Sequence, residues 1–257
     1  MKNKSMNAPV IDIKNISKSY TKKGRPVEVL KNISFSINDG EVVAMVGPSG
    51  CGKTTILKII CGLIKPDCGN IKYQNNDISY ALQKCLVGYI PQSLSLLSFR
   101  TVRKNIMLPL EVLRIKNCER SDELISLCEL QKYTNYYPHQ LSGGMRQKVA
   151  IARALSYKPK ILLMDEPMAS LDEMIKEKLN EELLKIKDST KSTIIYVTHN
   201  IEEAVFLSNR VVILSETPGT IIDVVSISLP DKRDSSLRSD PAFFQEVTKI
   251  RKILQNK

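Results

Sequence analysis

Hydrophobic positions along the chain follow two periods, one typical of strands and one typical of helices. Three short apolar runs have the length of buried strands: Val42–Val46, Ile161–Met164 and Thr193–Val197. Before them, apolar and polar residues alternate from Val10 to Tyr20, and a second run from Val27 to Ile37 ends in the turn signal Asn-Asp-Gly. We therefore expect an N-terminal β region followed by buried strands.

Helical spacing replaces strand spacing in two further segments. Between Leu94 and Tyr136 apolar residues recur at helical intervals, which predicts an inserted helical subdomain over approximately residues 94–148. The positions that define it are Leu110, Leu113, Leu124, Leu127 and Leu130. A second amphipathic helix is expected between the last two buried strands, with one apolar face made by Ile175, Leu179, Leu183 and Ile186.

The C-terminal part predicts a hairpin and a helix. Val211–Leu214 and Ile221–Ile227 are joined by a Pro-Gly pair, and Pro241–Leu254 is expected to form a helix on the outside. Buried strands that alternate with helices predict a mainly parallel sheet with helices on both faces. The fold class is therefore α/β.

Composition narrows the class of protein. Apolar residues make up 42% and charged residues 25%, as in a soluble globular protein. No apolar run reaches the roughly 18 residues of a membrane span, and the N-terminus lacks the apolar core and cleavage site of a signal peptide. We expect the chain to stay in the cytoplasm, where any membrane contact would come through a partner.

The cysteines and the net charge are also consistent with a soluble globular protein. The six cysteines contain no C-x-x-C pair and the two histidines lie far apart in the chain, so buried free thiols are favoured over a zinc site or disulfides. The formal net charge of +11 comes from basic residues spread along the chain, with few aromatic residues to stack on bases. Proximity to an anionic membrane surface therefore fits better than nucleic acid binding.

The sharpest local signal follows the first buried strand and precedes a helix expected to run to about Leu63. It matches G-x-x-x-x-G-K-[ST], a loop whose glycines let backbone N–H groups face a phosphate at a helix N-terminus. Lys53 would reach the β- and γ-phosphates of ATP, and the Thr54 hydroxyl would bind Mg²⁺. The predicted nucleotide-binding residues of this loop are Gly47, Pro48, Ser49, Gly50, Cys51, Gly52, Lys53, Thr54 and Thr55.

Cys51 lies inside this loop and allows two interpretations. A helix N-terminus and a neighbouring lysine lower the pKa of a thiol, so alkylation of Cys51 would inhibit ATP hydrolysis and ATP would protect it. Alternatively, Cys51 is a small residue that fills an unconstrained loop position.

The carboxylates that such a loop needs follow another buried strand. Four apolar residues place Asp165 at the C-terminal edge of the sheet, where ligands bind in open α/β folds. Asp165 would hold Mg²⁺, mostly through water, and Glu166 would polarise the attacking water as general base. Together with the phosphate loop, this pair predicts nucleotide hydrolysis.

The segment Leu-Ser-Gly-Gly-Met, residues 141–145, resembles the signature motif of the ATP-binding cassette (ABC) family. Ser142, Gly143 and Gly144 open a predicted helix, whose N–H groups and dipole suit a γ-phosphate. In the family this phosphate lies on the other subunit, which implies a dimer held together by ATP. The resemblance also implies the fold, a P-loop NTPase (RecA-like) core with a mainly parallel sheet, an N-terminal antiparallel β region and an inserted helical subdomain.

Further family positions follow in the expected order. Tyr20 resembles the aromatic residue that stacks on adenine, and Gln92 the glutamine that contacts Mg²⁺ and links the nucleotide to the transporter. Ser-Leu-Asp at 170–172 resembles the loop that crosses to the partner subunit, and His199 the switch histidine on the γ-phosphate. By this resemblance the catalytic residues are Glu166, His199 and Lys53, and the Mg²⁺ ligands are Thr54, Gln92 and Asp165.

The resemblance covers residues 10–229, predicted to be one ABC domain, and residues 230–257 are expected to form a C-terminal helical tail. It implies an ATPase on the cytoplasmic face of the cell membrane, bound peripherally through an integral membrane permease. A second cassette, forming a homodimer, is expected as partner, and an extracytoplasmic solute-binding protein would act indirectly. No nucleic acid partner is expected.

Finer features are similar to importers of the nitrate, sulfonate and taurine group, in which the segment after Gln92 lines a groove for a short helix of the membrane protein. Residues 97–102 and 105–110 carry this similarity, which implies a small anion as solute. Ser98-Phe99 stands where the group usually has Pro-Trp, and Asn200 stands where Asp is common. Importers of thiamine-precursor pyrimidines or of other small anions therefore remain alternatives.

Two rival classes lack support in the sequence. A soluble ABC-type ATPase acting on nucleic acid or ribosomes would carry long coiled coils or two cassettes in one chain, and this sequence has neither feature. A simple phosphate-loop kinase would not need the Leu-Ser-Gly-Gly-Met element.

Overall fold

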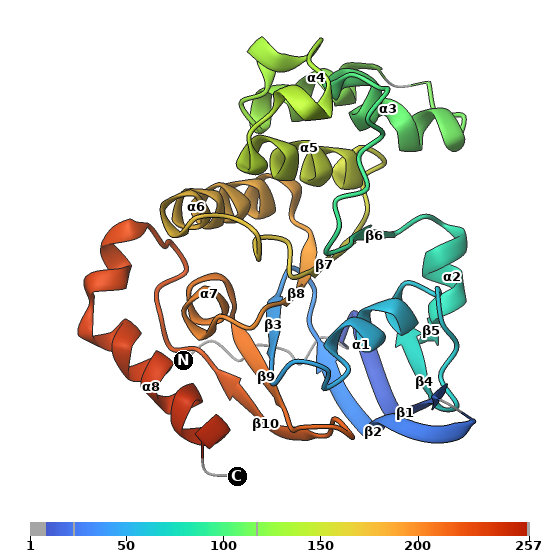
Figure 1. The fold of residues 1–257 in the computed structure, drawn as a ribbon, viewed down its shortest axis with the longest axis vertical. Helices are drawn as coiled ribbons and strands as arrows, with labels where there is room; N and C mark the ends of the chain where they lie inside the picture. The colour runs from blue at the N-terminus through green and yellow to red at the C-terminus, as the bar shows by residue number, and fades with distance from the viewer. Residues whose placement is uncertain (1–8, 23, 117, 256–257) are drawn as a thin grey trace.

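The computed structural model of the protein describes residues 9–22, 24–116 and 118–255, and it consists of two sheets, helices on the faces of the larger sheet and a helical layer at one end (Figure 1). The strands are β1 Ile11–Lys22, β2 Arg25–Ile37, β3 Val42–Val46, β4 Cys68–Tyr73, β5 Asn76–Asp77, β6 Val87–Ile90, β7 Ile161–Asp165, β8 Thr193–Val197, β9 Arg210–Leu214 and β10 Ile221–Ser226. The α-helices are α1 Lys53–Ile60, α2 Ile78–Gln83, α3 Val102–Val112, α4 Cys118–Leu127, α5 Gly143–Leu155, α6 Glu173–Thr190, α7 Ile201–Leu207 and α8 Pro241–Gln255. Short 3₁₀ turns lie at Gln131–Tyr133, Pro138–Gln140 and Ser235–Ser239.

The larger sheet has the strand order β10-β9-β3-β8-β7-β6 and is parallel except for β10, which pairs antiparallel with β9. Every residue of β3, β7 and β8 is buried, because helices or the second sheet cover both faces. The sequence prediction of a mainly parallel α/β sheet with a terminal hairpin is therefore confirmed. Because the strands are parallel, the loops after β3, β6, β7 and β8 leave from one edge.

The smaller sheet is antiparallel, with the order β2-β1-β4-β5. The first strand is longer than the alternating pattern predicted, and its register shifts around Asn15, which has a positive φ of 53°. This irregularity explains why Ile13 and Ile16 both point inward although they are three residues apart.

Alternate residues of the parallel strands feed two separate cores. Val43 and Met45 of β3 pack with the antiparallel sheet and α1, whereas Val42, Ala44 and Val46 pack with helices on the opposite face. The helix-facing core includes residues of α3 to α8, so the helical layer and the C-terminal helix share one continuous apolar cluster with the sheet. Within the described ranges, no helix is long and apolar enough to span a bilayer.

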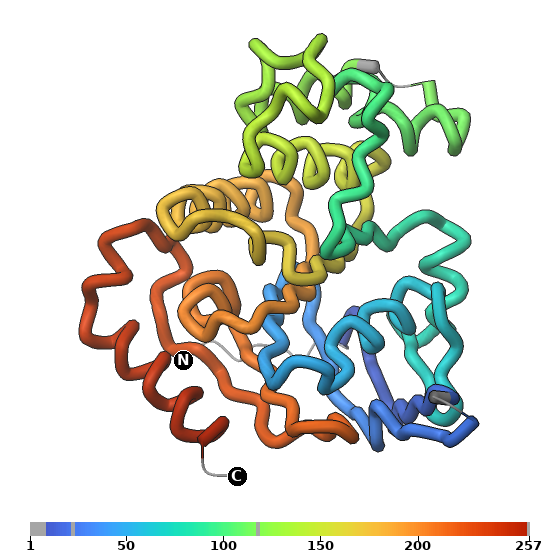
Figure 2. Tube along the Cα trace, viewed as in Figure 1, coloured from blue at the N-terminus to red at the C-terminus, as the bar shows by residue number. Residues whose placement is uncertain are grey.

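The chain leaves the parallel sheet after β6, builds α3 and α4, and returns along α5 before it enters β7 (Figure 2). Leu110, Leu124 and Leu130 of the predicted apolar positions are buried. Leu113 and Leu130 lie just outside the helices that the spacing predicted, because α3 ends at Val112 and α4 ends at Leu127. The predicted subdomain limits of 94–148 stay a prediction.

The helix after the phosphate loop is shorter than expected and ends at Ile60 rather than near Leu63. Gly62 has a φ of 74° there, a left-handed conformation that commonly terminates helices. The sequence analysis also did not identify β4, β5, β6, α2 or α7. These elements have two to seven residues each, too few for a clear period.

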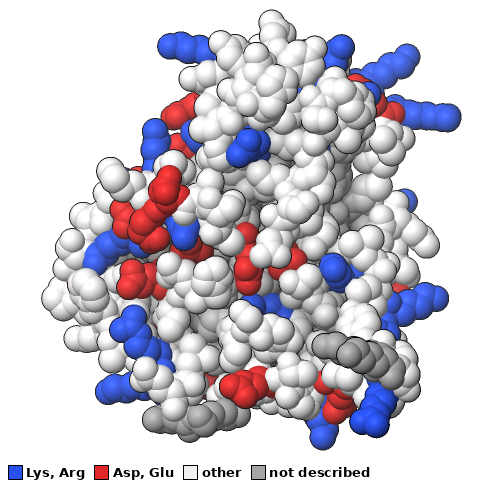
Figure 3. Space-filling model, viewed as in Figure 1, with Lys and Arg blue, Asp and Glu red and all other residues white. Residues whose placement is uncertain are grey.

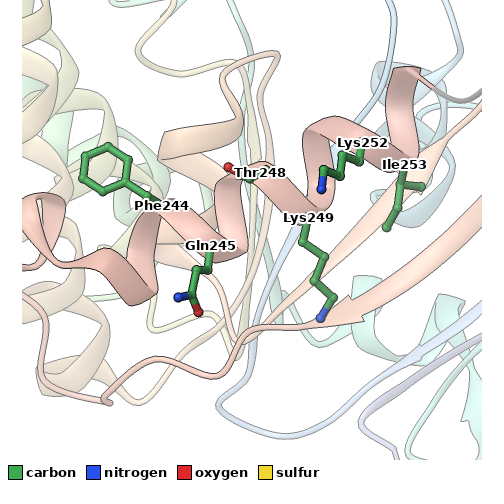
Figure 4. A pocket seen from close by; sticks show the side chains of 6 residues that line it. All are labelled: Phe244, Gln245, Thr248, Lys249, Lys252 and Ile253. Carbon is green, nitrogen blue, oxygen red and sulfur yellow. The ribbon is translucent and has the colours of Figure 1, made fainter.

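The C-terminal helix α8 packs against α7 and β10 through Phe243, Val247 and Ile250, which are buried. Its opposite side carries the half-exposed Phe244 and a shallow depression of about 600 Å³ (Figure 4). The residues that line the depression are Phe244, Gln245, Thr248, Lys249, Lys252 and Ile253. The helix is therefore amphipathic and lies on the outside, as the sequence predicted.

A buried arginine ties the segment before α8 to the core. Arg233 is 9% exposed, and its Nη1 donates hydrogen bonds of 3.1, 2.8 and 2.8 Å to the carbonyl oxygens of Val205, Phe206 and Ser208. These carbonyls end α7, where a helix has no intrahelical donors left for them. Burial lowers the pKa of Arg233, but the guanidinium remains charged at neutral pH.

Arg233→Ala should lower the unfolding free energy by about 2–4 kcal/mol, because it leaves buried carbonyls without a charged donor. The expected fall in Tm is roughly 5–10 °C, measured by scanning fluorimetry on the full chain. Lys232→Ala is the matched control, since Lys232 is exposed and should change Tm little. Equal Tm values for the two variants would contradict the capping role.

Candidate active site

The phosphate loop lies between β3 and α1, and its shape depends on glycines. Gly50 and Gly52 have φ angles of 82° and 98°, a region that side chains rarely tolerate. At Gly52 a Cβ atom would also lie only 2.4 Å from Cδ2 of Leu30 on β2, so a larger residue would require the buried Leu30 side chain to move. The sequence motif thus requires glycine here for conformation and for space.

A turn from the other end of the chain supports this loop. The hairpin between β9 and β10 places Gly219 against β2. The Gly219 N–H donates to Val29 O at 2.9 Å, and Gly219 O accepts from Lys31 N at 3.0 Å. Thr217 Oγ1 donates to Gly50 O at 3.0 Å. A Cβ on Gly219 would lie 2.1 Å from the Cys51 carbonyl oxygen, so the loop and the turn are in direct contact. Sequence reasoning used the Pro-Gly pair as a hairpin signal and missed its contact with the phosphate loop.

Lys53 opens α1 and points back over the loop. Its Nζ donates to Gly47 O at 2.8 Å and Pro48 O at 2.9 Å, and the side chain is only 6% exposed. No side chain caps the first turn of α1, whose N-cap is Gly52. A helix start with an ammonium group and uncapped N–H groups is suited to an anion such as a phosphate.

Asp165 ends β7 beside Thr54, as the strand pattern predicted. The Thr54 hydroxyl donates to Asp165 Oδ1 at 2.9 Å, and the Tyr89 hydroxyl donates to Oδ2 at 3.3 Å. Burial raises the pKa of Asp165, and the two hydroxyl donors oppose that rise. Burial beside Asp165 raises the pKa of Tyr89 strongly, so its hydroxyl stays a donor. Sequence reasoning gave Tyr89 no role, because only the pairing of β6 with β7 brings it here.

Glu166 lies at the centre of a second group of side chains. Its backbone has a φ of 44°, which is unfavourable for a residue with a side chain and is fixed by donation from its N–H to Val197 O at 3.0 Å. Its Oε2 accepts from Gln92 Nε2 at 3.3 Å and lies 3.5 Å from His199 Nδ1. Residues from the ends of β6, β7 and β8 therefore meet at one carboxylate.

Two predicted elements lie apart from this group. Tyr20 is 38% exposed on β1, where it pairs with Val27, and the Lys18 ammonium lies 5.8 Å from its ring centroid. Ser142 caps α5 by accepting from Met145 N at 3.3 Å, and Gly143 follows it. Among the described residues, no recorded hydrogen bond joins Tyr20 or the Ser142–Gly144 segment to the phosphate loop.

The two glycines that open α5 lie close to side chains of the following segment. A Cβ on Gly143 would lie 2.7 Å from Leu171, and one on Gly144 would lie 2.9 Å from Ile175 of α6. Ser142 is exposed and Gly143 is half-buried, so the first residues at the N-terminus of α5 lie at the surface of this chain, whereas Gly144 is buried.

Among the cysteines whose side chains the structure describes, Cys51 and Cys128 are buried as expected of free thiols, whereas Cys61 and Cys85 are only half-buried. Cys51 is fully buried, with Sγ 3.8 Å from Lys53 Nζ, so a reagent cannot reach it without movement of the loop, which favours the space-filling interpretation. Cys68 is exposed rather than buried, because it is the first residue of β4, whose first three residues are exposed. Burial raises the pKa of Cys61 and, for Cys128, raises it to about 12.

Charge is distributed unevenly on the face shown in Figure 3. Acidic side chains gather at the left and in the middle of this face, whereas lysine and arginine side chains are spread over the face and around its rim. This view shows no continuous basic stripe of the kind that follows a nucleic acid backbone.

Comparison with known proteins shows the family to which this chain belongs. The family model described as ABC transporter matches residues 30–169. An aliphatic sulfonates import ATP-binding protein of Bacillus cereus is 41% identical over 245 residues, which are 95% of this chain and 94% of that protein. A nitrate import ATP-binding protein of Synechocystis is 36% identical over 256 residues, 96% of each chain.

A solved dimeric structure of an ATP-binding cassette in a post-hydrolysis state, bound to ADP and phosphate, is 31% identical and has a TM-score of 0.74. The match covers 86% of this chain and 100% of the chain in the solved structure. The P-loop NTPase fold expected from the sequence is thereby confirmed. The chain belongs to the ABC transporter family and is one of its ATP-hydrolysing subunits.

Proposed function

We propose that this protein is the ATP-hydrolysing subunit of an importer for a small solute, an anion of the sulfonate, nitrate or taurine type. The observation that carries the ATPase part is the meeting of Lys53, Thr54, Asp165, Glu166 and His199 at one edge of the parallel sheet. The import part is supported by the relatives named as sulfonate and nitrate import proteins.

ATP is proposed to bind with its phosphates over the loop from Gly47 to Thr55. Lys53 would exchange its two backbone carbonyl partners for the β- and γ-phosphates, which are stronger acceptors. The half-exposed Tyr20 would stack on adenine, because the exposed face of its ring offers a large apolar contact to the base.

The residues around Asp165 suit Mg²⁺. Hydroxyl and carboxylate oxygens are the ligands this ion prefers, and Thr54 Oγ1 already lies 2.9 Å from Asp165 Oδ1. Thr54 and Gln92 would ligate the ion, and Asp165 would hold it mostly through water. When bound, Mg²⁺ would neutralise charge on the transferred phosphoryl group.

Glu166 is proposed to accept the proton of the attacking water, and His199 to bond the γ-phosphate. The Glu166 carboxylate lies between Gln92 and His199, and its unusual backbone conformation directs the side chain away from the regular strand path. Because Gln92 and His199 both contact this carboxylate, its position depends on the segments that follow β6 and β8.

One chain is proposed to hold half of each site. The capped N-terminus of α5, with Ser142 exposed, would bind the γ-phosphate held by a second copy, so that ATP lies between two subunits. The dimeric cassette structures of the same fold support this arrangement. Hydrolysis would then separate the copies, which gives a two-state switch.

The membrane permease is proposed to dock in an apolar groove of about 410 Å³ between α3, the start of β6 and the end of α5. Val112 on its rim is 72% exposed and would be covered by the docked permease. Arg153, which lines the groove, donates to the carbonyls of Leu94 and Ser95 at 2.6 and 2.8 Å. Movement of the segment after Gln92 would therefore be transmitted to the groove.

In this proposal the protein lies on the cytoplasmic face of the membrane and never contacts the solute. An extracytoplasmic solute-binding protein would act only through the permease. Selectivity for the solute would reside in those partners, so the similarity of the cassette to sulfonate and nitrate import proteins supports a solute class and not a single compound.

Glu166→Gln should leave ATP binding intact and reduce turnover by about 10²-fold or more, because the amide cannot accept the proton from water. ATP-bound dimer should accumulate. Phosphate release and size-exclusion chromatography with ATP and Mg²⁺ measure the two effects. Glu119→Gln, on α4 at the far end of the molecule in Figure 1, is the matched control and should behave as wild type. An unchanged hydrolysis rate for Glu166→Gln would remove Glu166 from this role.

Val112→Asp should abolish recovery of the permease when tagged protein is purified from gently solubilised membranes, since a charge would enter an apolar contact. Binding of ATP by the isolated chain should be unchanged. Phe244→Asp is the control, because it alters an exposed apolar residue on α8 outside the groove. If wild-type protein came away with nucleic acid or ribosomes and no membrane protein, the transport proposal would be wrong while the ATPase assignment stood.

A further inference from the structure

A buried polar cluster lies directly beneath the loop that carries His199. Glu203, in the first turn of α7, is 4% exposed, and its Oε2 accepts from Thr198 Oγ1 at 2.8 Å and from the Tyr196 hydroxyl at 3.2 Å. Thr198 is 3% exposed and Tyr196 is fully buried. The three side chains connect the end of β8 to α7 on either side of His199.

The two hydroxyl groups are what makes burial of this carboxylate possible. Among the described residues, no recorded ion pair involves Glu203, so its burial depends on hydrogen bonds. Burial next to Glu203 raises the pKa of Tyr196 far above its ordinary value, which keeps this hydroxyl protonated and able to donate. Removing either donor would leave an acceptor inside the protein with one partner fewer.

The same hydroxyl of Thr198 also fixes the chain after the histidine. It accepts from Asn200 N at 3.0 Å, while Asn200 Oδ1 accepts from the N–H groups of Glu202 and Glu203 at 2.8 and 3.2 Å. On the other side, Thr198 N donates to Met45 O of β3 at 3.3 Å. Both neighbours of His199 are thus held, one by the sheet and one by the helix.

His199 itself has little packing to orient it. Its side chain is 57% exposed, and its recorded polar contact is the 3.5 Å approach of Nδ1 to Glu166 Oε2. An exposed side chain on a loop takes its position mainly from the backbone beneath it. A shift of about 1 Å at a reacting group is enough to slow a reaction by roughly 10²-fold.

We propose that Thr198 and Glu203 are positioning residues for His199, and that the hydrogen bond between them sets the place of the imidazole beside Glu166. The proposal rests on the role of His199 in the proposed function. In this proposal the cluster affects catalysis because it holds His199 in place. A cluster that only stabilised α7 would leave the position of His199 unchanged.

The chain offers a direct probe, because His139 and His199 are its two histidines. Selective ¹³C labelling of histidine gives one imidazole signal for each. Thr198→Val, which keeps the shape and removes the hydroxyl, should shift or broaden the His199 signal and leave His139 unchanged. Thr198→Ser restores the hydroxyl and should restore the wild-type signal. An unmoved His199 signal in folded Thr198→Val would overturn the proposal.

His139 serves as the internal control for folding. It lies in the 3₁₀ turn before the signature segment, stacked on Tyr137 with ring centroids 5.9 Å apart, away from the Thr198 cluster. Movement of both signals would report unfolding, and Glu203→Gln would then replace Thr198→Val. This variant keeps side-chain volume and weakens the hydrogen bonds by removing the charge, so His199 alone should again move.

Steady-state ATP hydrolysis by the full chain supplies the second readout. Thr198→Val should lower kcat about tenfold, with KM changed by less than about twofold, because the phosphate loop is untouched. Tyr196→Phe removes the other donor to Glu203 without touching the backbone next to His199. It should lower Tm while kcat stays within about twofold of wild type, and an equal loss of kcat in both variants would overturn the proposal.

His199→Ala separates this proposal from the one on which it rests. If His199→Ala hydrolyses ATP at the wild-type rate, the proposed role of His199 is wrong, whatever the labelled signals show. If His199→Ala is slow and Thr198→Val changes neither the signal nor kcat, the role of His199 stands and the positioning role of Thr198 and Glu203 is wrong.

Discussion

Burial of the parallel sheet on both faces is the constraint on which the rest of the structure depends. Strands β3, β7 and β8 are buried throughout and mostly apolar, so they can lie only between two covering layers, here the helices and the antiparallel sheet. Parallel strands bring their carboxyl ends to one edge. Polar residues that follow those ends therefore meet in space: Lys53 and Thr54 after β3, Asp165 and Glu166 at β7, and His199 after β8.

The polar residues at that edge are held by contacts that come from distant parts of the chain. The turn at Gly219 supports the phosphate loop, Tyr89 donates to Asp165, and Glu203 anchors the residue before His199. Each contact either fills space that a glycine leaves or satisfies a buried oxygen. Among these polar residues, the His199 side chain is 57% exposed, whereas the Glu166 side chain beside it is 22% exposed.

Short elements and unassigned residues account for most of what sequence reasoning missed. The strands β5 and β6 and the helices α2 and α7 are too short to show a period, and the roles of Tyr89, Thr217 and Glu203 depend on pairing between strands far apart in sequence. The place of Cys51 in the phosphate loop allowed the interpretation that its thiol is reactive, yet Cys51 is fully buried, whereas Cys68 is exposed. Burial is a property of packing, so neighbours in sequence did not predict it.

The sequence by itself determined the buried strands, the phosphate loop, the carboxylates after β7 and the order of the family motifs, because each of these is a local pattern of residue types. Only the tertiary structure decided which side chains touch: the Thr54–Asp165 and Glu166–His199 contacts join residues more than 30 positions apart. It also decided that Ser142, the N-cap of α5, is exposed. The physical reason is that local preference follows from covalent neighbours, whereas contact and exposure follow from how the sheet and its covering layers pack.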